Sequence, residues 1–123
     1  MNDNTYFFDS YALIEIVRGN PGYQEYVHAS CLTTKMNLLE VVYAFLREEK
    51  IEAALTIVKE FQNKVIEPDA FTMIEIAAWK LQEKPKTFSF IDCLGYVLAK
   101  KMGIPFLTGD EEFKDKENVV FVR

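Results

Sequence analysis

Short, mostly apolar runs alternate along the chain with longer segments of helical periodicity. The short runs cover residues 6–8, 31–34, 64–67, 104–107 and 119–122. Short apolar runs bounded by polar residues are typical of strands that are buried on both faces, as in parallel sheets. The pattern therefore predicts a mostly parallel sheet of about five strands.

Between these runs, apolar side chains recur every three or four positions, which predicts helices. The expected helices cover residues 10–18, 36–50, 51–63, 68–83 and 89–102, and a short one runs from Pro21 through about His28. Strands that alternate with helices indicate a sheet sandwiched between helical layers. The sequence thus predicts one α/β domain over residues 1–123.

Three of these helices carry an apolar stripe that we expect to face the core. The stripes consist of Leu39, Val42, Tyr43 and Leu46, then Ala54, Leu55, Val58 and Phe61, and finally Phe71, Ile74, Ala78 and Leu81. By their spacing, we also expect most of the aromatic residues Tyr6, Tyr11, Tyr43, Trp79 and Tyr96 to lie in the core.

The composition supports a packed globular domain. Half of the 123 residues are hydrophobic, including ten Phe and six Tyr, which argues against disorder. No apolar stretch is long enough to cross a bilayer, and the N-terminus lacks the basic start of a signal peptide. We therefore expect a cytoplasmic protein without a membrane partner.

Histidine and cysteine are too scarce for several common kinds of site. His28 is the only histidine, so His-rich zinc sites and Ser-His-Asp or Cys-His catalysis have little to build on. Cys31 and Cys93 both lie among apolar residues, and we expect buried, reduced thiols rather than a disulfide.

The formal net charge of −5 argues mildly against a general nucleic-acid binder, because phosphate contacts need cations. The argument weakens if several acids form one metal site, since bound cations then offset them. Lys84, Lys86, Lys100 and Lys101 cluster in the sequence. They form either a local basic patch or solvated charges at helix ends.

Four acidic residues lie among apolar neighbours. Asp9 follows the first predicted strand, Glu40 interrupts an apolar helical segment, Asp92 is the only charge within residues 89–99, and Asp110 closely follows the strand at 104–107. A carboxylate in such surroundings is desolvated, which is costly unless it is paired, protonated or bound to a metal.

Capping offers another explanation for three of these acids. Asp9 can be the N-cap of the helix that follows it. Asp92 can form a capping box with Ser89, and Asp110 can cap a short turn at residues 111–113. For Asp92 the two interpretations are about equally supported.

Glu40 lies inside a predicted helix, so it cannot be a cap. Its alternative is a buried ion pair with Arg47 or Lys35, which gives little net stability. Strand ends and early helical turns converge at one edge of a parallel sheet. Hard cations such as Mg²⁺ or Mn²⁺ prefer carboxylate oxygens and water, so the four acids together predict a divalent-cation site.

The acids stand in four short motifs, namely Phe8–Glu15, Asn37–Glu40, Ser89–Asp92 and Leu107–Phe113. In the order and spacing of these motifs, the chain resembles PIN-domain proteins, and more narrowly the small single-domain members of the VapC toxin type. The resemblance covers nearly the whole chain. It does not extend to Tyr11, where many members have a small polar residue.

The resemblance implies a fold of about five strands sandwiched by helices, Mg²⁺- or Mn²⁺-dependent cleavage of RNA, frequent homodimers and often an antitoxin partner. The catalytic and metal-binding residues that it implies are Asp9, Glu40, Asp92 and Asp110, with Ser10, Ser89 and Thr108 as polar helpers. The alternative is a non-catalytic PIN-like scaffold that binds RNA or protein.

Overall fold

Residues 4–83 and 86–123 are described by the computed structural model of the chain, so Lys84 and Pro85 in the predicted helix break lie outside them. The strands are β1 (Thr5–Phe8), β2 (Ser30–Leu32), β3 (Phe106–Thr108) and β4 (Val119–Phe121). The α-helices are α1 (Ser10–Arg18), α2 (Lys35–Arg47), α3 (Ile51–Phe61), α4 (Ala70–Gln82) and α5 (Phe90–Met102). Three short 3₁₀ helices are η1 (Pro21–Tyr26), η2 (Gln62–Lys64) and η3 (Glu111–Phe113).

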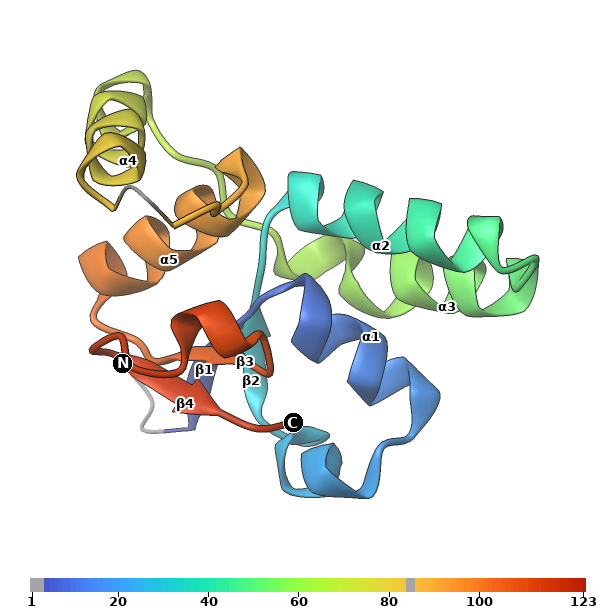
Figure 1. The fold of residues 1–123 in the computed structure, drawn as a ribbon. Helices are drawn as coiled ribbons and strands as arrows, with labels where there is room; N and C mark the ends of the chain where they lie inside the picture. The colour runs from blue at the N-terminus through green and yellow to red at the C-terminus, as the bar shows by residue number, and fades with distance from the viewer. Residues whose placement is uncertain (1–3, 84–85) are drawn as a thin grey trace.

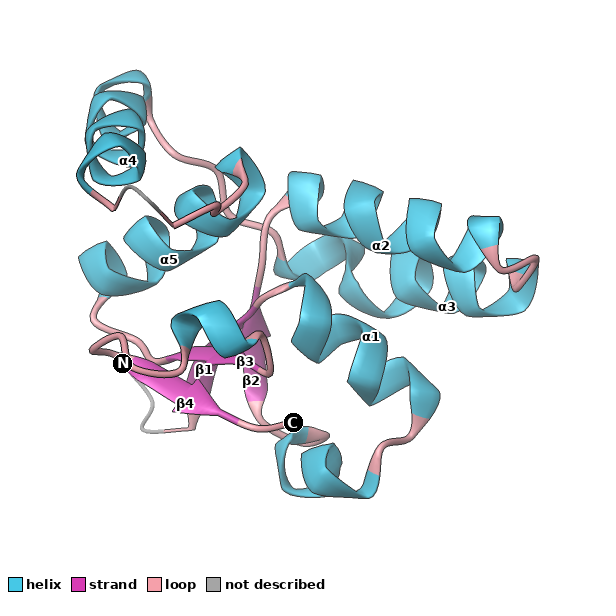
Figure 2. Cartoon of the chain, viewed as in Figure 1, coloured by secondary structure: helices cyan, strands magenta, loops and turns pink. Residues whose placement is uncertain are grey.

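The four strands form one parallel sheet in the order β2-β1-β3-β4 (Figures 1 and 2). The predicted parallel sheet is confirmed, but its predicted fifth strand at residues 64–67 is reduced to one bridge between Thr33 and Val65. Two hydrogen bonds make this bridge, from Thr33 N to Lys64 O and from Ile66 N to Thr33 O. Pro68 follows closely and has no N–H to extend the ladder.

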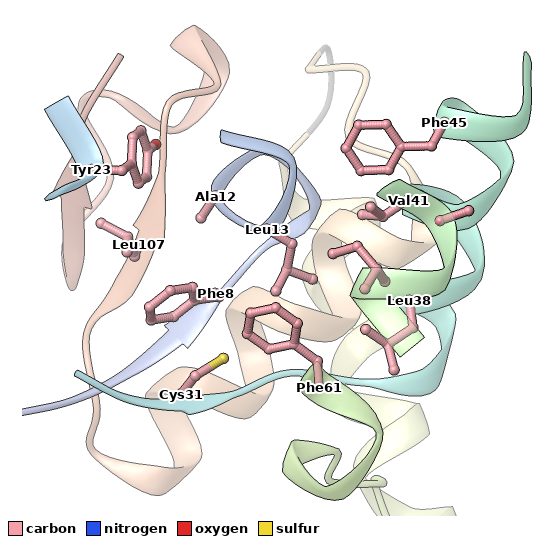
Figure 3. Close-up of a cluster of buried hydrophobic side chains, with 12 residues drawn as sticks. Phe8, Ala12, Leu13, Tyr23, Cys31, Leu38, Val41, Phe45, Phe61 and Leu107 are labelled. Atoms are coloured by element: carbon pink, nitrogen blue, oxygen red, sulfur yellow. The ribbon is translucent and has the colours of Figure 1, made fainter. Parts of the chain in front are cut away.

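Neighbouring residues of the central strands point to opposite faces of the sheet and belong to two separate cores. Phe8 and Leu107 pack with side chains of α1, α2 and α3 (Figure 3). Phe7 and Phe106, one position earlier in each strand, pack with α5 and α4. This alternation follows from the two-residue period of a strand, and it confirms a sheet sandwiched by helices.

The face of α2 that is buried differs from the predicted one. Leu39 and Tyr43 are each 61 % exposed, whereas Leu38, Val41 and Phe45 lie in the core. Figure 3 shows these three side chains on the side of α2 that faces the other core residues. Both sides of α2 are apolar at helical spacing, so the periodicity predicts a helix without selecting its buried face.

The same correction applies to parts of α3 and α4. In α3 the core positions are Ala54, Ile57 and Phe61, and the predicted Leu55 and Val58 are exposed. All four residues of the predicted stripe in α4, Phe71, Ile74, Ala78 and Leu81, are exposed. Packing of α4 on α5 instead buries Ile76 and Thr72.

Several smaller predictions can also be compared with the structure. Cys31 and Cys93 are buried free thiols, as expected. Lys100 and Lys101 pair with Glu117 and Glu75, which favours solvated helix-end charges over a basic patch. No helix among the described residues is long and apolar enough to span a membrane.

Candidate active site

The four predicted acids line one cavity of about 520 Å³ at the carboxyl ends of β1 and β3. Asp9 directly follows β1, and Asp110 comes two residues after β3. Glu40 lies in the second turn of α2, and Asp92 lies in the first turn of α5. Ligand sites of open α/β sheets occur at this edge. Four elements that are distant in sequence thus bring their carboxylates to one place.

Asp9 is both a helix cap and the most deeply buried acid of the cavity. Its side chain accepts a hydrogen bond of 2.9 Å from Ala12 N and so caps α1. Burial raises the pKa of Asp9 from 3.8 to about 7, mainly through desolvation. Hydrogen bonds from Thr108 and Ala12 lower this pKa, and the charges of Asp92 and Asp110 add to the rise.

Thr108 connects two of the acids. Its hydroxyl hydrogen-bonds the Asp9 carboxylate and accepts a bond of 3.0 Å from the backbone N–H of Asp110. The residue is completely buried at the end of β3. The predicted polar helper therefore lies where it fixes the positions of Asp9 and Asp110 relative to each other.

Asp92 and Ser89 form the reciprocal capping box that the sequence suggests. Ser89 N donates to Asp92 Oδ2 at 2.9 Å, and Asp92 N donates to Ser89 Oγ at 3.0 Å. Desolvation raises the pKa of Asp92, and the charges of Asp110 and Glu40 raise it further, against the hydrogen bonds from Ser89. The capping and site interpretations are thus compatible, because the cap holds Asp92 at the cavity wall.

Glu40 is half-buried, and no ion pair among the described residues includes it, so the expected alternative with Arg47 or Lys35 is not found there. One turn earlier on the same helix, the buried Asn37 amide donates to Ser10 Oγ at 3.0 Å. This bond joins the helix of Glu40 to the first residue after Asp9.

Asp110 lies where the backbone packs closely against Tyr11 and Val122. Its side chain accepts a bond of 3.0 Å from Glu112 N and caps η3, as predicted. At the preceding position, a Cβ atom on Gly109 would overlap the ring of Tyr11 and the carbonyl oxygen of Val122. Glycine is therefore required here, because the Tyr11 ring and the Val122 carbonyl leave no room for a side chain. Tyr11 stands where the resemblance expected a small polar residue.

The donor set of the cavity fits Mg²⁺ or Mn²⁺. Its lining offers carboxylates and a serine hydroxyl, with no histidine or cysteine, which is the preference of hard divalent cations. The raised pKa values of Asp9 and Asp92 mean that their ionised forms gain from a nearby cation. Among the described residues, no three acidic, histidine or cysteine side chains already enclose a metal position.

Two residues of this region were missed by the sequence-based reasoning. Asn37 begins the Asn37–Glu40 motif, one helical turn before Glu40, and that spacing was an available signal. Arg123 also lines the cavity and pairs with Glu111 at 2.9 Å. Nothing in the sequence pattern near Arg123 indicated this location.

Comparison with known proteins agrees with the predicted fold. The family model described as the PIN domain matches residues 6–119. No curated protein sequence matches the chain. The sarcin-ricin loop cleaving toxin VapC20 of Mycobacterium tuberculosis superimposes with a TM-score of 0.75 at 15 % identity, covering 96 % of this chain and 99 % of that one.

Two further solved structures have the same fold. A toxin–antitoxin complex from Klebsiella pneumoniae matches with a TM-score of 0.73 at 15 % identity, covering 94 % of this chain and 95 % of the other. VapBC2 from Rickettsia felis, bound to a DNA fragment from its promoter, matches with a TM-score of 0.70 at 16 % identity, covering 95 % and 96 %. These likenesses confirm the predicted fold.

Proposed function

We propose a function from the premise that this chain belongs to the PIN domain family. The protein is a Mg²⁺- or Mn²⁺-dependent endoribonuclease that hydrolyses phosphodiester bonds in single-stranded or structured RNA. The observation that carries the proposal is the meeting of Asp9, Glu40, Asp92 and Asp110 around one cavity. The likeness to a toxin that cleaves the sarcin-ricin loop supports RNA as the substrate class.

In this proposal Asp9, Asp92 and Asp110 hold one or two divalent ions, and Glu40 is a further ligand or orients the attacking water. A bound ion lowers the pKa of water toward about 7 and offsets charge that builds on the phosphate oxygens. Thr108 holds Asp9 by its hydroxyl. Ser89 holds Asp92 through the capping box.

Ser10 has a different part in the proposed site. Its hydroxyl accepts a hydrogen bond from Asn37 and thereby fixes α2, which carries Glu40, against the start of α1. In this proposal the three predicted helpers position the acids.

We further propose that the protein is the toxin of a toxin–antitoxin pair and forms homodimers. The likeness to structures of toxin–antitoxin complexes supports an antitoxin partner. Exposed large apolar side chains, among them Leu39, Tyr43, Phe71 and Ile74, also support association, because such surface is unfavourable in water.

The test is cleavage of single-stranded RNA with Mn²⁺ by the wild-type protein and by Asp92→Asn. Asparagine keeps an oxygen that can accept the Ser89 N–H, so the variant removes the charge and retains the cap. We expect cleavage to fall by about 100-fold or more, the scale for losing one electrostatic group in an active site. EDTA should abolish wild-type cleavage.

Asp69→Asn is the matched control. Asp69 caps α4 by accepting from Thr72 N at 2.8 Å, as Asp9 caps α1, but it does not line the cavity. Its variant should cleave RNA at the wild-type rate. Equal activity of wild type and Asp92→Asn points to a contaminating nuclease. Folded but inactive wild-type protein over a broad RNA panel favours the non-catalytic scaffold.

A further inference from the structure

Arg123 is the one basic side chain among the described residues that line the acidic cavity. Five carboxylates share this lining, those of the four proposed ligands and of Glu111. A cavity of this charge repels the phosphate of RNA as long as its acids are ionised and no cation offsets them. The position of Arg123 therefore matters for any anionic substrate.

The backbone next to Arg123 is held firmly at the end of β3. Val122 N donates to Thr108 O at 2.8 Å, and the Tyr23 hydroxyl donates to the Val122 carbonyl oxygen. Tyr23 is completely buried. The same carbonyl lies so close to Gly109 that a side chain there would overlap it. These contacts fix where the side chain of Arg123 begins, beside the cavity that Asp110 also lines.

The side chain itself is free to change partner. Its guanidinium lies 2.9 Å from Glu111 Oε1, and both side chains are more than half exposed. Exposed ion pairs contribute little to stability because water screens them. A guanidinium also matches phosphate oxygens with two parallel hydrogen bonds. Exchanging the Glu111 carboxylate for a phosphate is therefore inexpensive.

We infer that Arg123 is a substrate-binding residue: its guanidinium releases Glu111 and then binds a backbone phosphate of RNA at the cavity. The inference rests on the proposed function and deepens it. Divalent ions then offset the negative charges of the inner acids, while the Arg123 guanidinium supplies a permanent positive charge at the rim. Glu111 holds the guanidinium at the cavity when no RNA is bound.

The test is binding of a fluorescently labelled single-stranded RNA in the presence of Mn²⁺, over a range of NaCl concentrations. All proteins carry Glu40→Gln to prevent turnover, a substitution that leaves Asp9, Asp92 and Asp110 to hold the ion. We expect Arg123→Gln to raise the dissociation constant about 10-fold, the scale of one hydrogen bond to a charged group. The slope of log affinity against log salt should also shrink by about 0.7, the value for one phosphate contact on a single strand.

Three further variants separate a phosphate contact from a structural role. Arg123→Lys should keep the salt slope and recover part of the affinity. Glu111→Gln should bind RNA more tightly, since it releases the guanidinium. Arg47→Gln is the matched control, because Arg47 lies over the Tyr43 ring at 5.5 Å and does not line the cavity. It should bind like the parent.

Unchanged affinity and salt slope in Arg123→Gln overturn the inference alone and leave the proposed function standing. A Glu111→Gln variant that loses affinity as Arg123→Gln does also overturns it, because the ion pair would then be what matters. A folded parent that binds no RNA overturns the inference and the proposed function together. If RNA binding depends on Arg123 but the wild-type protein does not cleave RNA, the inference stands and the proposed ribonuclease activity is rejected.

Discussion

The side-chain amide of Asn37 donates a hydrogen bond of 3.0 Å to the hydroxyl of Ser10 and so ties α2 to the first residue of α1. The amide oxygen of Asn37 accepts from the Thr34 hydroxyl at 2.6 Å. Only 2 % of Asn37 is exposed. This buried polar link connects the helix that carries Glu40 with the strand end that carries Asp9.

Asn37→Ala should lower the free energy of unfolding by about 1–3 kcal/mol, because it leaves the buried Thr34 hydroxyl and the partly buried Ser10 hydroxyl without their partner. Urea denaturation measures the change. Asn63→Ala removes an exposed amide from η2 and should change stability by less than about 0.5 kcal/mol. Equal stability of the two variants would show that the Asn37 link contributes nothing.

Asp9 should make the metal-free protein less stable as the pH rises from about 4 to 7. Its pKa is 3.8 ordinarily and about 7 in the folded protein, so the folded state keeps a proton that the unfolded state has released. Stability from this group is fully present below pH 3.8 and is lost as the pH rises through 7.

Asp9→Asn removes this titration. The difference in free energy of unfolding between the variant and the wild type should therefore grow in favour of the variant between pH 4 and 7. Denaturant titrations at several pH values with EDTA measure it. A difference that stays constant across this range contradicts the raised pKa of Asp9.

Mn²⁺ should stabilise the wild-type protein, since only the folded state brings the four carboxylates together. At a free Mn²⁺ concentration 100 times its dissociation constant, the gain in free energy of unfolding is about 2.7 kcal/mol. Thermal unfolding with and without Mn²⁺ detects it. Asp110→Asn should abolish most of the gain, whereas Glu52→Gln, an exposed acid of α3, should retain it. A shift that is equal in both variants indicates non-specific binding.

Metal binding should also release protons near neutral pH. Burial raises the pKa of both Asp9 and Asp92, and a cation favours their ionised forms. Calorimetric titration in buffers of different ionisation enthalpy measures the number of protons released. Binding of Mn²⁺ without proton release at pH 6 to 7 would argue against Asp9 as a ligand.

Gly109→Ala should destabilise the fold by about 1–3 kcal/mol, the usual cost of overpacking. The added methyl group overlaps both the Tyr11 ring and the Val122 carbonyl oxygen. Adding Tyr11→Ala relieves one of the two overlaps, so the double variant should lose less stability than the two single losses together. Strict additivity would show that the Tyr11 ring is not the obstacle.

The pattern of the chain was sufficient to predict the parallel sheet and the meeting of the four acids at one edge of it. Phe7 and Phe8 lie in a continuous apolar run, and such a run is buried on both faces. Asp9 and Asp110 follow strands, and parallel strands end at a common edge, so their meeting follows from topology. The capping box of Ser89 and Asp92 depends only on local sequence, and it was also correctly predicted.

The sequence by itself therefore determined the class of fold, the caps and the convergence of four carboxylates at one edge of the sheet, since these depend on local periodicity and on strand direction. Only the tertiary structure decided which face of α2 is buried, because Leu38 and Leu39 both belong to apolar stripes and packing against α1 and α3 selects one. It also decided that Arg123 lies at the cavity. That position depends on contacts of Val122 with Thr108 and Tyr23, which are distant in sequence and leave no periodic signal.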